Sequence, residues 1–490
     1  MSSTKKYPVS RRDFIRFSAA TTAAVSMLPL GSCNIGKTPA PLKRKFGNFG
    51  FEVTTLGLGG QASLQWTPND VEPVEIILKA FDLGVNYFDT SNLYDDSQLN
   101  YNKAFRKLHL IPGEAGYNEK LRNSIWLTSK TCMRWGKPGW PAREDVSNRS
   151  NGMPEVQCAV DDLKRSLTQI FGDNKGKYPE GAYLDMILIH TLENINDVDV
   201  LYEGLETPLD PDGNFGALVA LRDFRDGTNL TGMNPEREKL VRHIGFSGHA
   251  NPPAMVDMIQ RDEYGILEGM LVAMNANDKT RFNMQNNVIP VAQAKGMGII
   301  AMKVFADAAM YHKEPRWSRE PADVYLKVGS PELPSRPLIE YTLTTPGIHT
   351  AIIGTGHIDD DPMKCQLTQN FYAAQIEHGG MPQGERSRIE EQAAKVKRES
   401  NYFQIQKVGL TGPRNLRASE NKIIWDTAFA GDSPIATYEV MINGNKAGEV
   451  EHVPQTLKSK PFVFETEFNE ADKVAVYAVD KKGAKMATQL

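Results

Sequence analysis

Four polar residues stand where apolar runs of the sequence end, and their types suit proton transfer. Asp89 and Tyr94 follow one such run, Lys130 closes a second and His190 closes a third. A free tyrosine has a pKa of about 10, so near neutral pH it is a reluctant acid or base. A neighbouring ammonium group favours the phenolate and lowers that pKa. The four residues therefore indicate general acid–base chemistry at an oxygen atom, provided that the fold brings them together.

Short apolar runs alternate with amphipathic helical patterns through most of the chain, which predicts an α/β fold. The runs lie at 56–59, 85–88, 125–128, 184–189, 244–246, 270–274, 298–302 and 350–353. Eight strand–helix units over about three hundred residues are typical of a (β/α)8 TIM barrel with insertions. A doubly wound open sheet is the alternative, and it is disfavoured because no G-x-G-x-x-G opens the first helix. In a barrel the carboxyl ends of the strands share one face, where the four residues should meet.

The motifs around these residues resemble those of the aldo-keto reductase family. Asp89 and Tyr94 match its D-T-x-x-x-Y motif after strand two, Lys130 the lysine that closes strand three, and His190 the histidine that closes strand four. Further segments resemble the opening hairpin of the family and its strands five, seven and eight, at 45–54, 242–247, 296–303 and 353–356. The likeness covers roughly residues 43 to 375. It implies a (β/α)8 barrel with an N-terminal β-hairpin and an NAD(P)-dependent interconversion of carbonyl and alcohol by hydride transfer.

The resemblance also implies a role for each of the four residues. Tyr94 is expected to act as general acid in reduction and as base in oxidation, with Lys130 beside it to lower its pKa. Asp89 would hold Lys130 by an ion pair. His190 would orient the substrate carbonyl or assist proton movement. Together they would serve an oxygen that gains negative charge as the hydride arrives.

A nucleotide site, for NADP or NAD, is implied at the same strand ends. The expected contacts are Gly59, Ser247, Gly248, Asn275, Met302, Lys303, Gly354, Thr355, Gly356, Gln366 and Asn370. Three of the family's nicotinamide contacts are altered, since Gly248 follows Ser247 where asparagine is usual, Leu271 replaces a glutamine and Met302 replaces a stacking aromatic. The Lys/Arg pair that grips a 2′-phosphate is missing from 355–361, where three aspartates stand instead. These acids favour an unphosphorylated ribose.

The N-terminus predicts export. Residues 10–16, Ser-Arg-Arg-Asp-Phe-Ile-Arg, fit a twin-arginine signal, and 30–33, Leu-Gly-Ser-Cys, resemble a lipobox in which Cys33 is lipidated. The stretch between them is too short and too rich in small residues for a confident membrane span. We expect a periplasmic lipoprotein attached to the membrane through Cys33, with its nucleotide tightly bound before export. A basic N-terminus followed by an ordinary apolar segment is the alternative.

Composition excludes some functions. The net charge is −4 and no long basic run lies outside the signal, so nucleic-acid binding has little support. The four cysteines are widely spaced and predict neither a disulfide framework nor a zinc site, and no metal is expected. After a charged helix at 385–398, alternating strands predict a small C-terminal β-sandwich that resembles a fibronectin type III module. Trp425 and Tyr477 are expected in its core, and its surface could contact a protein or glycan.

The expected organisation is a signal at 1–33, a linker at 34–42, a barrel at 43–400 and the sandwich at 405–490. The longest insertions, 132–154 and 192–214, follow strand ends and are expected to roof a pocket. Two functions follow: an oxidoreductase acting on an aldehyde, ketone or sugar, or a non-catalytic exported binding or accessory lipoprotein on the same barrel. A metal-dependent hydrolase has little support, because the strand ends lack paired histidines or bridging carboxylates.

Overall fold

The computed structural model describes residues 38–141, 143–148, 153–206, 209–280, 283–311, 313, 316–325, 327–397 and 409–490. The expected export signal with Cys33 lies outside the described residues, as does the start of the linker. Within the described ranges, no helix is both long enough and apolar enough to cross a bilayer.

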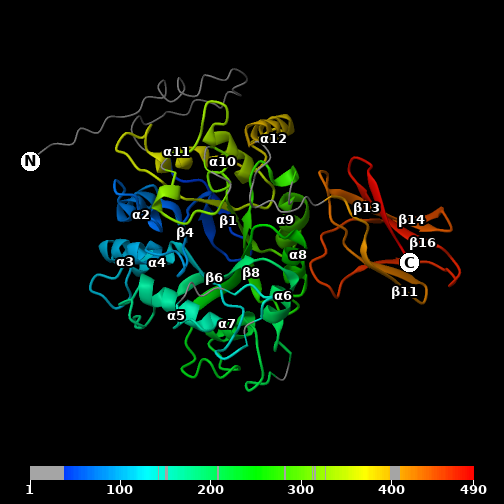
Figure 1. The fold of residues 1–490 in the computed structure, drawn as a ribbon, viewed down its shortest axis with the longest axis horizontal. Coiled ribbons are helices and arrows are strands. Elements are labelled where there is room, and N and C mark those ends of the chain that lie inside the picture. The colour runs from blue at the N-terminus through cyan, green and yellow to red at the C-terminus, as the bar shows by residue number, and fades with distance from the viewer. Residues whose placement is uncertain are drawn as a thin grey trace, which may run out of the picture.

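Eight parallel strands close into a barrel, which confirms the predicted fold class (Figure 1). The strands are β3 (Leu56–Leu58), β4 (Tyr87–Asp89), β5 (Trp126–Thr131), β6 (Leu184–Leu192), β7 (Val241–Gly248), β8 (Leu267–Ala273), β9 (Gly298–Met302) and β10 (Thr350–Ile353). Each pairs with the next along the chain, and β10 returns to pair with β3. Strands of a closed parallel barrel are covered on both faces, which explains why they are continuous apolar runs in the sequence.

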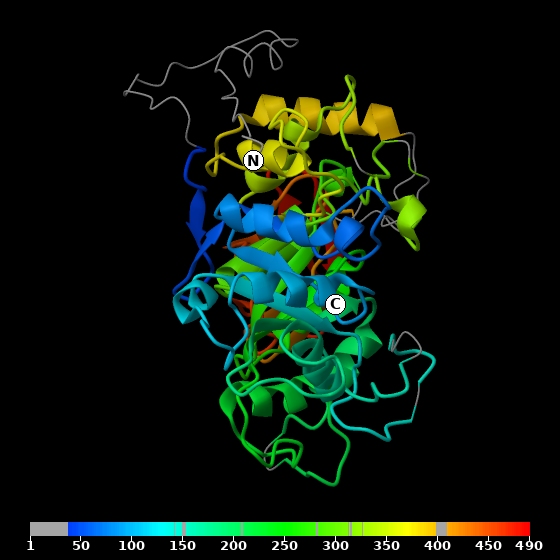
Figure 2. The same cartoon turned by 90° about the vertical axis from the view of Figure 1, so that its left-hand side faces the viewer.

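Helices surround the barrel and bury their apolar faces against its strands. They are α2 (Pro73–Asp82), α3 (Ser97–Lys107), α4 (Glu119–Asn123), α5 (Ala159–Ile170), α6 (Ile195–Tyr202), α7 (Ala217–Asp226), α8 (Pro252–Gln260), α9 (Met284–Ala294), α10 (Ser335–Leu343), α11 (Gln366–Ala373) and α12 (Gln383–Lys397). Pro73 is the first residue of α2. Proline fits there because the N–H that it lacks would have no partner within the helix. Figure 2 shows α2 and α3, in blue, lying across the outside of the barrel.

A hairpin of β1 (Lys43–Lys45) and β2 (Glu52–Thr54) covers the amino ends of the strands. Phe46, in its turn, packs edge-on against Trp126 at the start of β5, with ring centroids 5.1 Å apart. A side chain at Gly298, the first residue of β9, would run into the ring of Phe46. The hairpin therefore closes one end of the barrel and leaves the carboxyl ends of the strands for a site.

The C-terminal region consists of two antiparallel sheets, as the sequence predicts. One sheet holds β11 (Arg414–Ser419), β12 (Lys422–Asp426) and β15 (Phe462–Glu465); the other holds β13 (Ile435–Ile442), β14 (Asn445–Glu451), β16 (Val474–Asp480) and β17 (Lys485–Gln489). Trp425 is buried in the shared core, as expected. The expectation for Tyr477 is wrong: it is only half-buried, because its neighbours Val476 and Ala478 take the inward positions of β16.

This C-terminal module lies beside α8 and α9 of the barrel (Figure 1). Asn287 of α9 binds both backbone groups of Ala430, accepting from its N–H at 2.7 Å and donating to its carbonyl at 3.0 Å. Gln260, at the end of α8, donates to the carbonyl of Gln455 at 2.8 Å. The module thus makes buried, directional contacts with the side of the barrel.

The three cysteines of the described chain are Cys132, Cys158 and Cys365. All are buried free thiols. Cys132 follows the end of β5, Cys158 precedes α5 and Cys365 precedes α11.

Candidate active site

The four expected residues come together at the carboxyl ends of neighbouring strands. Asp89 ends β4, Tyr94 follows it in the turn before α3, Lys130 lies near the end of β5 and His190 near the end of β6. The hydroxyl of Tyr94 lies 3.3 Å from Nε2 of His190. Nζ of Lys130 donates to Oδ1 of Asp89 at 2.6 Å and to the carbonyl of Thr90 at 2.8 Å. The barrel therefore assembles the proton-transfer set that the motifs imply.

The expected lowering of the Tyr94 pKa by Lys130 is not found. Burial raises the pKa of Tyr94 well above its ordinary value, and the negative charges of Asp89 and Asp307 raise it further. Lys130 points its ammonium group at the face of the Tyr94 ring, 4.6 Å from the centroid, while it binds Asp89. Burial and the neighbouring carboxylates outweigh the ammonium group of Lys130, whose charge is partly offset by Asp89, so Tyr94 holds its proton near neutral pH.

The Asp89–Lys130 pair is almost fully buried, with side chains 2% and 1% exposed. Burial raises the pKa of Asp89 and lowers that of Lys130, and each is partly offset by the charge of the other. The second carboxylate oxygen of Asp89, Oδ2, is buried without a hydrogen-bond partner among the described residues. Asp89 also lines the cavity described next, so this oxygen is poised to accept from a ligand.

Two adjoining cavities, of about 280 Å³ and 200 Å³, lie at these strand ends. Tyr94 and His190 line both of them. The larger extends toward β9 and β10, where the expected nucleotide positions lie, and the smaller extends toward Cys132 and Arg134 after β5. The acid–base pair therefore stands at the junction of two binding spaces.

Five of the expected nucleotide contacts line the larger cavity: Gly59, Met302, Lys303, Gly354 and Gln366. Six others do not: Ser247, Gly248, Asn275, Thr355, Gly356 and Asn370. Leu271, which replaces the family's glutamine, also lines the wall. The apolar side chains of Leu271 and Met302 thus occupy the part of the wall where the family uses an amide and an aromatic ring.

Two of the residues away from the wall are engaged in holding the protein's own backbone. Ser247 accepts the N–H of Thr191 at 2.8 Å. Asn275 donates to the carbonyl of Lys303 at 3.2 Å. Gly248 packs so closely against Met255 that a Cβ at this position would clash with the methionine side chain. These three support the strand ends next to the cavity and do not face it.

The larger cavity reaches β10, where polar groups lie on its wall and near it in the sequence. Gln366, the first residue of α11, accepts the N–H of Gly356 at 2.6 Å and lines the wall. Thr355 Oγ1 and Asn370 Nδ2 are buried close by in sequence and have no partner among the described residues. Neither of these two residues lines the cavity, so they do not face a ligand in it. On the wall itself, the backbone of Gly354 and the amide of Gln366 are polar groups that fit a nucleotide on this side.

The loop after β9 contributes residues that the sequence motifs do not single out. Asp307 lines the cavity, forms an ion pair with Lys313 at 2.6 Å and lies 3.7 Å from Nζ of Lys303. The residues 306–308 all have left-handed backbones, with φ of 49°, 57° and 63°, although none is glycine. Strain of this kind concentrates at functional sites. Only its place after a strand carboxyl end hints at this loop in the sequence.

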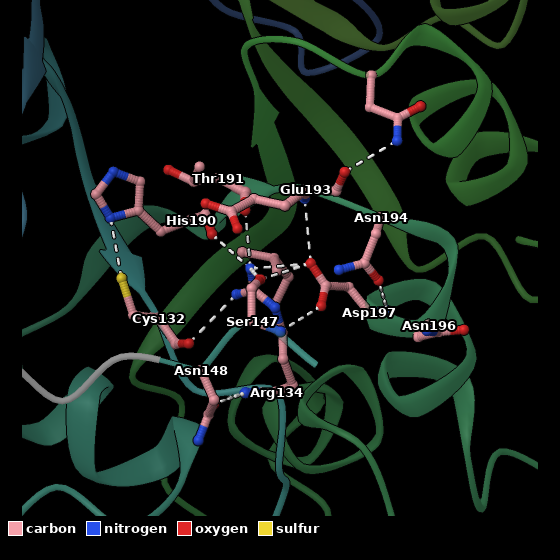
Figure 3. Close-up of polar contacts among 12 residues, drawn as sticks. Cys132, Arg134, Ser147, Asn148, His190, Thr191, Glu193, Asn194, Asn196 and Asp197 are labelled. Carbon is pink, nitrogen blue, oxygen red and sulfur yellow. Dashed lines mark hydrogen bonds and ion pairs between the residues drawn. The ribbon is translucent and has the colours of Figure 1, made fainter. Parts of the chain in front are cut away.

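Arg134, in the insertion after β5, is a second residue that motif reasoning misses (Figure 3). It is only 2% exposed and donates through Nη2 to the carbonyls of His190 and Thr191, both at 2.9 Å, and to Ser147 Oγ at 2.8 Å. Asp197 of α6 accepts from Ser147 at 2.6 Å and lies 3.5 Å from the guanidinium. The network ties the 132–148 segment to the strand end that carries His190.

The smaller cavity has a mixed wall. Its aromatic members are Trp66, Tyr94 and Trp317, and its polar members include Gln61, Gln65, Arg134, Ser147, His190, Thr191, Glu193 and Ser318. Gln65 is buried, and its Oε1 has no hydrogen-bond partner within the described ranges. The described part of the chain holds no group of three or more His, Cys, Asp or Glu side chains that could bind a metal ion.

Known proteins resemble parts of this chain. The model of the aldo/keto reductase family matches residues 55–320. An uncharacterized oxidoreductase, YqkF of Bacillus subtilis (strain 168), is 29% identical over 169 residues, 34% of this chain; the chain spans only 44% of the length of that relative. A solved aldo-keto reductase of Bacillus halodurans, in its holo form, is 18% identical over 74% of this chain and 99% of its own, with a TM-score of 0.46. A putative aldo-keto reductase of Pseudomonas aeruginosa is 22% identical over 68% and 95%, with a TM-score of 0.41.

Proposed function

The chain belongs to the aldo/keto reductase family, whose model matches more than half of it, and we propose that it is an NAD(P)-dependent oxidoreductase that interconverts a carbonyl compound and an alcohol. The observation that supports this most is the place of Tyr94 and His190 at the junction of two cavities. A reaction between two bound molecules needs both held side by side, with the acid at their meeting point. One cavity would take the nucleotide and the other the carbonyl compound.

Gly59, Lys303, Gly354 and Gln366 would hold the nucleotide, whose nicotinamide supplies or accepts the hydride. The protein's own contribution is the proton. In reduction Tyr94 donates its hydroxyl proton to the carbonyl oxygen, and its raised pKa keeps that proton in place until the oxygen becomes basic. The resulting phenolate would be stabilised by a hydrogen bond from His190 and by the nearby ammonium group of Lys130.

The smaller cavity favours a hydroxylated carbonyl compound, such as a sugar, over an alkyl aldehyde. Trp66 and Trp317 offer flat faces for a ring. The wall also carries Gln65, whose buried Oε1 has no hydrogen-bond partner within the described ranges; a hydroxyl group can donate to it, whereas an alkyl chain would leave it unsatisfied.

The direct test is purification under native conditions, followed by mass spectrometry for retained nucleotide and an assay of nicotinamide absorbance with a panel of carbonyl compounds. We expect bound or bindable NAD(H) or NADP(H) and turnover that is higher with hydroxylated members than with alkyl aldehydes of equal length. A protein that binds neither nucleotide would contradict the proposal. It would instead fit a non-catalytic binding lipoprotein on the same barrel.

We also propose that the chain is exported by the twin-arginine route with its nucleotide already tightly bound, and is anchored in the periplasm through lipidated Cys33. The support is the order of the motifs at 10–16 and 30–33. The C-terminal module, which resembles fibronectin type III in its sequence, would then be available to a protein or glycan. The double variant Arg11→Lys/Arg12→Lys should stay in the cytoplasm, and the Cys33→Ala variant should be released from membranes. Fractionation of both variants like the unaltered protein would contradict the proposal.

A further inference from the structure

We infer that Cys132 is a positioning residue that sets the tautomer of His190, an assignment that rests on the proposed function. The thiol Sγ lies 3.2 Å from Nδ1 of His190 (Figure 3), and the opposite ring nitrogen, Nε2, lies 3.3 Å from the hydroxyl of Tyr94. Cys132, His190 and Tyr94 therefore form an unbroken chain of hydrogen-bonding groups that leads into both cavities.

The direction of this chain follows from the capacities of its members. A neutral imidazole has one N–H donor and one acceptor nitrogen. A thiol is a weak donor and a weaker acceptor, so the S–H of Cys132 donates to Nδ1 and the imidazole proton resides on Nε2. Nε2–H then donates to the oxygen of Tyr94. The hydroxyl proton of Tyr94 is left free to point at a substrate carbonyl.

The opposite tautomer would spoil this arrangement. With the proton on Nδ1, Nε2 of His190 becomes an acceptor and competes for the only proton that Tyr94 has. The phenolate formed after proton transfer would also face a lone pair in place of an N–H donor. The thiol therefore matters through the histidine and does not itself touch the reacting atoms.

The backbone of Cys132 is held so that its thiol keeps this direction. Its N–H donates to Oδ2 of Asp162 at 2.9 Å, and its carbonyl accepts from Nη1 of Arg134 at 3.3 Å. The side chain is only 5% exposed. With both ends of the residue tied, the sulfur has little freedom to turn away from the imidazole.

His190 is fixed from its own side as well. The pairing of β6 with β7 shifts register between Ile189 and Leu192, and Thr191 has a left-handed φ of 52°. The irregularity leaves the carbonyls of His190 and Thr191 to Arg134, which binds both (Figure 3). Arg134 thus holds the backbone of the histidine while Cys132 holds its ring.

The test compares Cys132→Ala, which removes the donor, with Cys132→Ser, which keeps one. Cys158→Ala is the matched control, because Cys158 is an equally buried thiol that precedes α5, outside both cavity walls. The readout is the nitrogen chemical shifts of His190 in protein labelled with ¹⁵N-histidine, assigned among the nine histidines with a His190→Asn variant. We expect the Nε2–H form in the wild type, in Cys132→Ser and in Cys158→Ala, and a mixture of tautomers in Cys132→Ala.

Turnover gives a second readout. The kcat of Cys132→Ala should fall on the order of tenfold, with KM nearly unchanged and with recovery in Cys132→Ser. An unchanged tautomer in Cys132→Ala, or a thiolate–imidazolium pair with protons on both ring nitrogens, would overturn the inference. The tautomer is measured without substrate. A protein with no turnover would therefore contradict the proposed function, while the spectra would still decide whether Cys132 sets the tautomer of His190.

Discussion

The ammonium group of Lys130 lies over the face of the Tyr94 ring, 4.6 Å from its centroid, while its hydrogen bonds go to Asp89 and to the carbonyl of Thr90. A cation in this position is attracted to the ring without approaching the hydroxyl. It can stabilise a phenolate once one forms, but in the resting site burial dominates and the pKa of Tyr94 is raised.

Carbonyl reduction should tolerate alkaline pH. The acid in reduction is protonated Tyr94, which persists below its pKa, and burial raises that pKa well above 10. The kcat/KM for carbonyl reduction should therefore show no loss from tyrosine ionisation up to about pH 10. Alcohol oxidation needs the phenolate and should still be rising there. Steady-state rates in both directions across the alkaline range check this, and a decline of the reductive rate near pH 8 would show that Lys130 does lower the pKa.

Replacement of Tyr94 by phenylalanine removes the proton donor and little volume. Turnover should fall by about 10²- to 10⁴-fold, with nucleotide affinity changed by less than about twofold. Tyr101→Phe is the matched control, since Tyr101 is buried nearby and its hydroxyl donates weakly to the carbonyl of Asp89, at 3.4 Å. Equal losses in both variants would mean that the site depends on packing and not on the hydroxyl of Tyr94.

Nucleotide choice can be measured by titration. The family's cationic pair for a 2′-phosphate is absent, and Asp359, Asp360 and Asp361 follow β10 instead, so NADH should bind more tightly than NADPH. Exchange of the exposed Asp360 for arginine should narrow the difference. Glu420→Arg, in the C-terminal module, makes the same change of charge away from the cavity and should leave the ratio as it was. Tighter binding of NADPH by the unaltered protein would contradict the prediction.

Much of the barrel could be read from the sequence, because eight parallel strands covered on both faces leave eight apolar runs. The placement of Asp89, Tyr94, Lys130 and His190 at strand ends follows from the same alternation. What the alternation cannot show is how loops fold. Arg134 lies in an irregular segment, and its partners are distant carbonyls that no spacing encodes. Ser247 has the residue type of a ligand contact, yet its hydroxyl is used by Thr191.

Asp162 should make stability depend on pH. Burial raises its pKa to about 6, partly offset by hydrogen bonds from Thr131 and Asn92 and from backbone N–H groups after β5. The folded protein therefore holds a proton that the unfolded chain releases near pH 4, and this contribution, about 3 kcal/mol, is fully present below pH 4 and lost as the pH rises through 6. Urea unfolding between pH 4 and 7 checks it. Asp162→Asn should flatten this part of the curve; an unchanged slope would assign it to other groups.

Asn287 joins the barrel to the C-terminal module. Its alanine variant leaves the N–H of Ala430 buried without its partner and removes one of the two hydrogen bonds to its carbonyl, which Asn283 also donates to at 3.3 Å, so the free energy of unfolding should fall by about 1 to 3 kcal/mol. Asn286→Ala is the control, because it loses one hydrogen bond, to the carbonyl of Gly431 at 3.0 Å, and Asn286 is only half-buried. Calorimetry should resolve the two variants, and equal stabilities would show that the contact adds little.

The burial of Cys132, Cys158 and Cys365 has a consequence for the order of events in the life of the chain. While the polypeptide is unfolded these thiols are open to oxidation and to random cross-linking, and an oxidising compartment would trap mispaired forms. Once the barrel has closed, Cys158 and Cys365 are sealed from an oxidant, and Cys132 meets only what enters the smaller cavity. A chain with these thiols that entered an oxidising compartment would gain from completing its folding among reductants first, so the order of folding and exposure to an oxidant would decide its chemical durability there.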